Sequence, residues 1–169
     1  MANTCSNAIF CKNKETFVKI MAFVDKSKIN FEMIVPEPKT TKEFLKEIMD
    51  VADDVDDYYS ENYSLKNLWR RYYWGATYNN DADCKDFGDG HQFITFETPW
   101  TPPTGIVKAL WDMGCDFDFY YNDEYDAKIH SLHMNTSIEM ESFEVEDRDV
   151  INTMATLFDC SYWLEENDE

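Results

Sequence analysis

Residues 91–121 read HQFITFETPWTPPTGIVKALWDMGCDFDFYY, and this stretch decides the fold. In its first part, β-branched and aromatic side chains alternate between two faces of an extended chain. The alternation predicts a strand over residues 91–98 that is covered on both sides. Its two faces consist of Phe93 and Thr95 on one side and Ile94 and Phe96 on the other.

A capped helix and a second strand are predicted to follow. Thr101 stands where an N-cap residue belongs, and a proline at the first helical position suits a turn with unused donors, so the helix should begin at Pro102. An apolar stripe at three-to-four spacing then runs to Gly114, which can end a helix. Residues 116–121 alternate acidic and aromatic side chains, as in a strand with one solvent-exposed face. We expect Trp100 and Pro102 to fix the corner between strand and helix structurally, with the Trp100 side chain buried.

Three segments support a family resemblance. FETPWTPP at residues 96–103 precedes the amphipathic helix, WGATYN stands at residues 74–79, and ANTCSN at residues 2–7. In this order they resemble the aromatic-x-Thr-x-Trp-Ser/Thr-Pro-Pro signature, the Trp-Gly-Thr-Lys-Trp-Asn segment and the N-terminus of the YubB-like ferredoxin-like domain family of bacteriophage and plasmid proteins. Residues 76–78 depart from the family pattern. The resemblance implies a β-α-β-β-α-β core but no reaction, because that family has no established one.

The predicted fold class is therefore α+β, with a ferredoxin-like β-α-β-β-α-β core, a helical insertion and a C-terminal extension. We expect a single domain over residues 1–169. The predicted parts are a core at about residues 1–35 and 74–135, a helical insertion at about 36–73, and a strand and helix extension at about 136–169 that ends in an acidic tail.

Capping residues place the other predicted elements. Asn13 can cap a first helix from Lys14, after a strand at residues 4–11, and the apolar run FEMIV predicts a strand at residues 30–35. Thr40 and Glu43 have the spacing of a capping box, so the insertion should start with a helix at Thr41. The remaining elements are a helix capped by Ser64 with Leu65, Leu68, Trp69 and Tyr72 facing inward, a strand within residues 77–87, paired strands at 127–134 and 138–145, and a last helix capped by Asp147.

The charge balance limits the classes of molecule that the protein can bind. The chain has 34 acidic and 15 basic residues, a formal net charge of −19. Such a field repels nucleic acids and anionic membranes and attracts basic surfaces. The sequence contains no apolar run of membrane-spanning length and no signal peptide pattern, so we expect a cytoplasmic protein. The family resemblance implies that the cell is a bacterial host. Five scattered cysteines without CxxC pairs predict reduced thiols.

An acidic ridge is predicted on the first helix of the insertion. If this helix continues to residue 61, five carboxylates share one side of it: Asp50, Asp53, Asp54, Asp57 and Glu61. Negative charges in the last turns of a helix oppose the helix dipole and repel one another. This local cost suggests that the ridge serves to contact a partner. A solvated face in an acidic protein is the simpler alternative. Arg70 and Arg71, the only arginine doublet, are expected to pair with nearby carboxylates.

Two functions from different classes follow. In the first, the protein binds a basic surface of a host protein through the acidic ridge, as a nucleic-acid mimic that inhibits a defence nuclease of the anti-restriction or anti-CRISPR type. In the alternative, an aromatic cleft around Trp74, Tyr78 and Trp100 makes the protein an enzyme or a small-ligand-binding domain. The sequence contains no phosphate loop, nucleophile elbow or zinc helix. Asn79, Asp81 and Asp83 have the spacing of a calcium loop but lack its glycine and its final glutamate, so we expect no catalytic residues, cofactor or metal.

Overall fold

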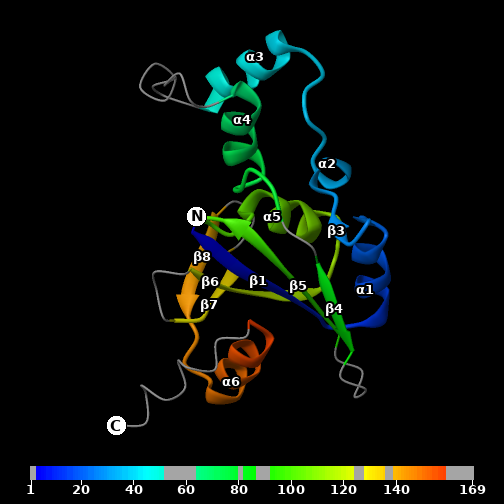
Figure 1. The fold of residues 1–169 in the computed structure, drawn as a ribbon, viewed down its shortest axis with the longest axis vertical. Helices are drawn as coiled ribbons and strands as arrows, with labels where there is room; N and C mark the ends of the chain where they lie inside the picture. Colours follow the sequence, from blue (N-terminus) through cyan, green and yellow to red (C-terminus); the bar gives the residue numbers. More distant parts are fainter. Residues whose placement is uncertain are drawn as a thin grey trace.

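The computed structural model describes residues 3–51, 64–79, 82–86, 92–123, 128–135 and 139–158. Helices surround a twisted sheet, and two of them project away from it (Figure 1). In chain order the elements are β1 (Thr4–Cys11), α1 (Lys14–Met21), β2 (Val24–Asp25), β3 (Lys28–Ile29), α2 (Phe31–Ile34), α3 (Thr41–Val51), α4 (Leu65–Tyr73), β4 (Asp83–Asp86), β5 (Gln92–Pro99), α5 (Thr104–Asp112), β6 (Phe117–Asp123), β7 (His130–Asn135), β8 (Glu139–Glu144) and α6 (Arg148–Leu157).

The larger sheet is antiparallel, with its described strands in the order β4-β5-β1-β6-β7-β8, and β2 and β3 form a separate hairpin. The central strand β1 pairs with β5 on one side and with β6 on the other. Its register places Ile9 opposite both Ile94 and Phe119, and all three side chains are buried. The first and last strands of the stretch at residues 91–121 therefore flank β1.

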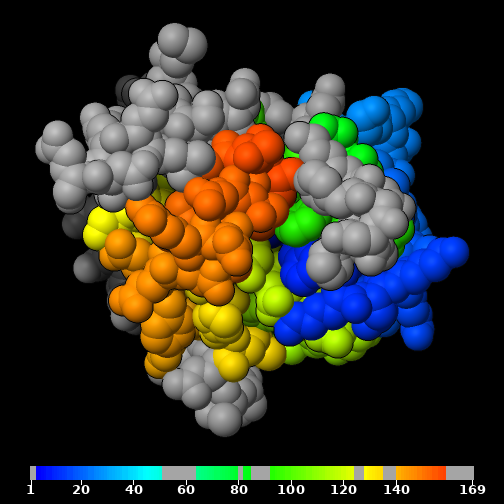
Figure 2. Space-filling model, turned by 90° about the horizontal axis from the view of Figure 1, so that it is seen from below, coloured from blue at the N-terminus to red at the C-terminus, as the bar shows by residue number. Residues whose placement is uncertain are grey.

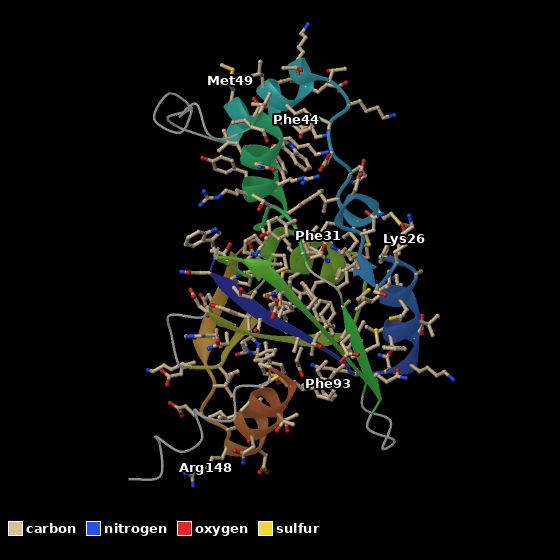
Figure 3. All side chains as sticks on the ribbon, in the orientation of Figure 1. Lys26, Phe31, Phe44, Met49, Phe93 and Arg148 are labelled. Carbon is tan, nitrogen blue, oxygen red and sulfur yellow. The ribbon has the colours of Figure 1, made fainter. Side chains whose placement is uncertain are left out.

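Alternate side chains of β1 and β5 enter two separate apolar clusters. Ile9 and Ile94 belong to the cluster that α1 and α5 cover, whereas Ala8 and Phe93 belong to the cluster under α6. Figure 1 shows α5 and α6 on opposite sides of the sheet, and Figure 3 shows Phe93 on the side of α6. The prediction that residues 91–98 form a strand covered on both faces is confirmed.

The helix after this strand starts later than predicted. Its first residue is Thr104 instead of Pro102, and Pro103 occupies the N-cap position without a side-chain cap. Thr101 does not cap the helix, because the helix begins at Thr104 and Pro103 holds the N-cap position. The backbone N–H of Thr101 donates to the carbonyl of Pro99 in a tight turn. Its hydroxyl donates to the carbonyl of Gly75, 2.7 Å away. The expected cap residue therefore connects this corner to another segment.

The expected strand at residues 30–35 is wrong. Residues 31–34 form the short helix α2, and the side chain of Asn30 accepts a hydrogen bond from the backbone of Met33. Phe31 and Ile34, three residues apart, are both buried. A short apolar run fits either a strand or a helix; the Asn30 cap favours the helix, and burial of Phe31 and Ile34 in the core selects it.

The helices α3 and α4 pack against each other and project from the body; we call this pair the arm (Figure 1). The capping box is confirmed, since Glu43 accepts from the backbone of Thr40 and Thr40 accepts from the backbone of Glu43. Ser64 caps α4 as predicted. Trp69 is buried in the arm and stacks on Tyr73 at 4.8 Å. Tyr72, which we expected to face inward, is 43% exposed, so that expectation is wrong.

The C-terminal elements follow the predicted order. β7 and β8 pair from His130 opposite Glu144 to Asn135 opposite Glu139. Asp147 accepts hydrogen bonds from the backbone of the first turn of α6, which confirms the predicted cap. Within the predicted strand at residues 77–87, the structure describes strand pairing only for residues 83–86. No described helix has the length and apolar character needed to cross a membrane.

The described cysteines are free thiols, and three of them are buried. Burial raises the pKa of Cys5 and of Cys11 to about 12, and it also raises the pKa of Cys115. Cys84 is exposed. Since the thiolate is the reacting form and must be accessible, buried thiols with raised pKa values react slowly.

We therefore predict that one thiol reagent molecule labels the native Cys160→Ser variant rapidly, at Cys84. The Cys84→Ser, Cys160→Ser double variant should label only after denaturation, as followed by mass spectrometry. Rapid labelling of Cys5 or Cys11 in the native double variant would contradict the described packing.

Candidate functional site

The predicted acidic ridge lies almost entirely outside the described residues. Asp50 is exposed in the last turn of α3. The structure does not describe Asp53, Asp54, Asp57 and Glu61, so the ridge stays a prediction. The described part of α3 does leave its outer side uncovered, since Met49 is 68% exposed and Phe44 lies on the side facing α4 (Figure 3).

A buried carboxylate fixes the base of the arm. The side chain of Glu37 is 5% exposed and forms ion pairs of 2.5 Å with both Lys66 and Arg70 of α4. Arg70 also donates to the carbonyl of Thr77 and lies 4.7 Å above the ring of Trp74. The expectation that the arginine doublet pairs with carboxylates is confirmed for Arg70. These contacts hold α4 in one orientation on the body.

A second acidic surface was not predicted. Strand β8 lies at the edge of the described sheet, and α6 begins four residues after it. Figure 2 shows this segment, in orange, on the surface of the molecule seen from below. Its exposed carboxylates, which we call the acidic edge, are Glu141, Glu144, Glu146, Asp147 and Asp149. The density of acids in residues 139–149 was a signal in the sequence, but only the structure shows that these side chains share an exposed edge.

An apolar groove lies beside the acidic edge, between α6 and the sheet. Its volume is about 570 Å³, and Phe10, Phe93 and Tyr120 contribute aromatic rings to its lining. Asp147 and Asp149 line it as well. Burial, followed by the nearby carboxylates of Asp118 and Asp147, raises the pKa of the Tyr120 hydroxyl. Aromatic rings and carboxylates therefore meet in one groove.

At the other end of the sheet, two segments that are distant in sequence meet; we call this contact the junction. It joins residues 74–79 to residues 99–105. The Thr101 hydroxyl donates to the carbonyl of Gly75, and the Gly105 backbone N–H donates to the carbonyl of Trp74 at 3.2 Å. These are the segments WGATYN and PWTPPTG, so the structure brings together two stretches that the family resemblance singled out.

The three aromatic residues of the predicted cleft do not share one cleft. Trp74 is 3% exposed, and its indole N–H donates to the carbonyl of Val35, so it is a core residue. Trp74 and Tyr78 line a pocket of about 440 Å³, and Trp100 lines another of about 340 Å³. Thr77 lines both pockets. The predicted burial of Trp100 is wrong, because this side chain is 52% exposed.

The backbone of Trp100 is strained. Its φ is +69°, in the left-handed region that glycine adopts readily and that costs other residues about 1–2 kcal/mol. Lys26 and Ser27 also have positive φ, but they form the two-residue turn between β2 and β3, where such angles are usual. For Trp100, neither a hairpin turn nor burial accounts for a bulky aromatic side chain. Strain of this kind is often found at functional sites.

The pocket beside Trp100, which we call the Trp100 pocket, has an unusual lining for so acidic a chain. Among the described residues that line it, Arg71 carries a charge and none is a carboxylate. Asn67 and Arg71 reach it from successive turns of α4 and were not predicted as site residues. Their spacing of four residues puts them on one helix face, but only the structure shows which pocket that face meets.

The described part of the chain contains no group of three or more His, Cys, Asp or Glu side chains that could hold a metal ion. His130 stacks on Tyr121, and His133 lies against Phe143.

A family model described as the ferredoxin-like domain in Api92-like protein matches residues 73–161. The chain belongs to this family. The match agrees with the mixed α/β structure and its antiparallel sheet, and it confirms the predicted ferredoxin-like class. The family's description names a fold and no reaction. No curated protein and no solved structure matches the chain.

The Api92-like match begins at the last residue of α4 and extends beyond α6. It therefore includes both segments of the junction and the acidic edge. Most of the arm, with Asn67 and Arg71, precedes it. The Trp100 pocket lies at the boundary, since residues 75–77 and 99–101 of the Api92-like domain line one side and α4 lines the other.

Proposed function

We propose that this protein binds a basic surface of a partner protein through its carboxylates. The observation that carries the proposal is the acidic edge, where exposed carboxylates stand beside an aromatic groove. The excess of 19 negative charges over the whole chain would guide a basic partner toward it. Neither catalytic residues nor a bound cofactor are part of this proposal.

The groove suits the side chains that a basic partner would supply. Lysine and arginine bury their apolar stems while their charged heads seek carboxylates, and both heads are attracted to aromatic faces. Phe10 and Tyr120, both partly exposed, offer such faces, and Asp147 and Asp149 offer the carboxylates. A partner's cation that enters the groove would lose part of its hydration, and breaking a desolvated charge pair speeds dissociation.

The finer parts of the proposal concern origin and target. We propose that the chain is a YubB-like phage or plasmid protein in a bacterial cytoplasm, in which β1, α1, β4, β5, α5 and β6 form the ferredoxin-like core and α2 to α4 an insertion. The target would be a nucleic-acid-binding defence protein. A helix rises ~1.5 Å per residue and duplex DNA carries one charge per ~1.7 Å, so a helical acidic ridge can imitate the charge spacing of DNA.

Two neutralised variants test this function. The ridge variant carries Asp50→Asn, Asp53→Asn, Asp54→Asn, Asp57→Asn and Glu61→Gln, and the edge variant carries Glu141→Gln, Glu144→Gln, Glu146→Gln and Asp149→Asn. Asp147 is kept because it caps α6. Both should fold, and at least one should bind a partner isolated with the wild-type protein about tenfold more weakly or worse. Wild-type binding should weaken as added salt shortens the Debye length below ~10 Å.

A third variant with Glu15→Gln, Asp112→Asn and Asp116→Asn provides the control, because it neutralises exposed acids near α1 and α5. It should keep its affinity for the partner. If the ridge and edge variants both retain wild-type affinity and salt dependence by titration calorimetry, the carboxylates are only a solvated surface and the proposal fails.

A second function is supported by Trp100. An exposed aromatic side chain on a strained backbone, beside a pocket of about 340 Å³, is typical of a ligand-binding residue. The second candidate is therefore a small-ligand-binding domain that uses the Trp100 pocket, without the buried Trp74 as a contact.

A further inference from the structure

Strand β8 exposes one side of its backbone. It is the last strand in the described sheet order, and no described strand pairs with its outer side (Figure 1). The backbone N–H of Val145 donates to the carbonyl of Ile129 at 2.8 Å, which continues the register of β7 with β8. In an antiparallel ladder, residues bonded to the neighbouring strand alternate with residues whose backbone groups point away from it. The N–H and C=O groups of Met140, Ser142 and Glu144 therefore point outward.

This edge is long enough to pair with another strand. β8 has 6 residues, which is an ordinary strand length, and an exposed edge of such length is a template for a further strand. Its sequence, EMESFE, contains neither the proline nor the lysine that often blocks an edge. Acidic side chains are therefore what controls access to its backbone.

The charges along the edge determine which strand can pair with it. Glu141 and Glu144 are exposed on β8, and Glu146 is exposed just after it. A second copy of the chain is disfavoured, because two acidic strands of a protein with a net charge of −19 would lie side by side. A basic strand is favoured for the same reason. The ion pair of 2.8 Å between Lys128 and Glu144 shows that a lysine head can lie at this edge.

An exposed aromatic ring lies on the same strand. Phe143 is 49% exposed, and its ring lies edge to face against His133. Phe143 is opposite Ser131, which is opposite Tyr120, so the ring lies on the side of the sheet that α6 covers. Glu141, two positions away, lies on that side as well. A lysine or arginine of an added strand would meet a ring for its stem and a carboxylate for its charged head.

We propose that β8 pairs with an extended basic segment of a partner protein, which adds a strand to the sheet. Main-chain hydrogen bonds with Met140, Ser142 and Glu144 hold the segment in place. Lysine or arginine at every second position faces Glu141 and Phe143 and makes the contact specific for basic segments. The inference rests on the first function proposed above, and it names the form in which the partner binds.

A short peptide tests this pairing with the full chain. The probe is KTKTKTK with blocked ends, because its lysines share one face of a strand. Hydrogen exchange followed by NMR should show that the peptide slows exchange of the amides of Met140, Ser142 and Glu144 by about tenfold or more. The amides of Glu141 and Phe143 face β7 in the ladder, so their exchange should change less.

Two matched peptides separate backbone pairing from charge. One is KTKTKTK with N-methyl groups throughout its backbone, which keeps the lysines but removes the donors of the ladder. The other is ETETETE, which keeps the donors but reverses the charge. By titration calorimetry, each should bind about tenfold more weakly than the probe or worse.

Two substitutions of Ser142 test the edge of the protein itself. Ser142→Pro removes an N–H that points away from β7, where an edge strand tolerates proline, so the fold should persist while binding of KTKTKTK falls about tenfold or more. Ser142→Val keeps this N–H and should bind like the wild type. It is the matched control, because both variants lose the contact between the serine hydroxyl and the Tyr121 hydroxyl, 2.7 Å away. If Ser142→Pro does not fold, the three peptides decide the question with the wild-type protein.

Four results would overturn the inference. Slow exchange of the outward amides before any peptide is added would mean that another segment of this chain or a second copy already pairs with β8. Equal binding of the N-methylated peptide would show that side chains alone make the contact, and equal binding of ETETETE would refute the basic class. If KTKTKTK does not bind or protects no outward amide, no basic strand pairs with β8. The first proposed function is judged separately, by the affinity of the ridge and edge variants for the isolated partner, and it can stand when this inference fails.

Discussion

Replacing Trp74 by alanine is expected to lower the free energy of unfolding by about 3–5 kcal/mol, whereas Trp100→Ala should change it by less than about 1 kcal/mol. Trp74 is 3% exposed and contacts Phe31 and Trp69 edge to face, at ring distances of 5.7 and 5.8 Å. Its indole N–H is satisfied by the carbonyl of Val35. Truncation would leave a cavity where the arm, α2 and the sheet meet, and it would leave that carbonyl without its partner.

Trp100 differs because half of its side chain is already in water, and because its backbone strain is independent of the ring. Urea denaturation of both variants, followed by far-ultraviolet circular dichroism, measures the two changes. Trp100→Gly is a useful third protein and should be at least as stable as the wild type, since glycine relieves the left-handed strain. A loss of several kcal/mol in Trp100→Ala, or a stable Trp74→Ala, would contradict the described burial.

Local sequence signals predicted the parts of the fold that depend on local chemistry. The alternation in residues 91–98 identified β5 and its two covered faces, because the period of two is set by the strand itself. The helix caps could also be predicted from the sequence. The side chains of Asn13, Ser64 and Asp147 all accept hydrogen bonds from backbone N–H groups in the first turn of the helix that follows. Each of these signals involves residues within a few positions of one another.

The errors arose where a distant segment decided the outcome. Thr101 has the chemistry of a cap, but Gly75, 26 positions away, takes its hydroxyl. Trp100 has the composition of a core residue, but the turn at residues 99–101 directs it to the surface. The run FEMIV fitted both a strand and a helix. The burial of Phe31 and Ile34 depends on core residues that are distant in sequence, so the pattern of the run alone could not predict it.

The candidate sites show the same limit. The sequence showed how many acids the chain has, but the exposure of five of them along β8 and α6, beside three aromatic rings, depends on how the sheet edge and helix pack. Likewise, Arg71 and Trp100 lie 29 positions apart and meet only because the junction joins α4 to the corner before α5. The acidic edge and the Trp100 pocket are lined by different residues, so variants can test the two proposed functions independently.

The junction itself should be intolerant of one methyl group. Gly105→Ala is expected to lower the free energy of unfolding by about 2–4 kcal/mol, although alanine normally favours a helix over glycine by about 1 kcal/mol. A Cβ at this position would lie 1.9 Å from the carbonyl oxygen of Tyr73, so the two segments must move apart. That movement would also break the hydrogen bond from the Gly105 N–H to the carbonyl of Trp74.

Gly114→Ala is the matched control for this substitution. Its φ of +79° makes alanine unfavourable by about 1–2 kcal/mol, but no atom lies within 4 Å of the added Cβ. Thermal and urea unfolding of both variants should therefore show the larger loss for Gly105→Ala, and the NMR shifts that it causes should extend to residues 74–77 and to the Trp100 pocket. Equal losses in the two variants, or a stabilised Gly105→Ala, would mean that α4 and α5 do not approach as closely as described, because only that approach turns a favourable helix substitution into an unfavourable one.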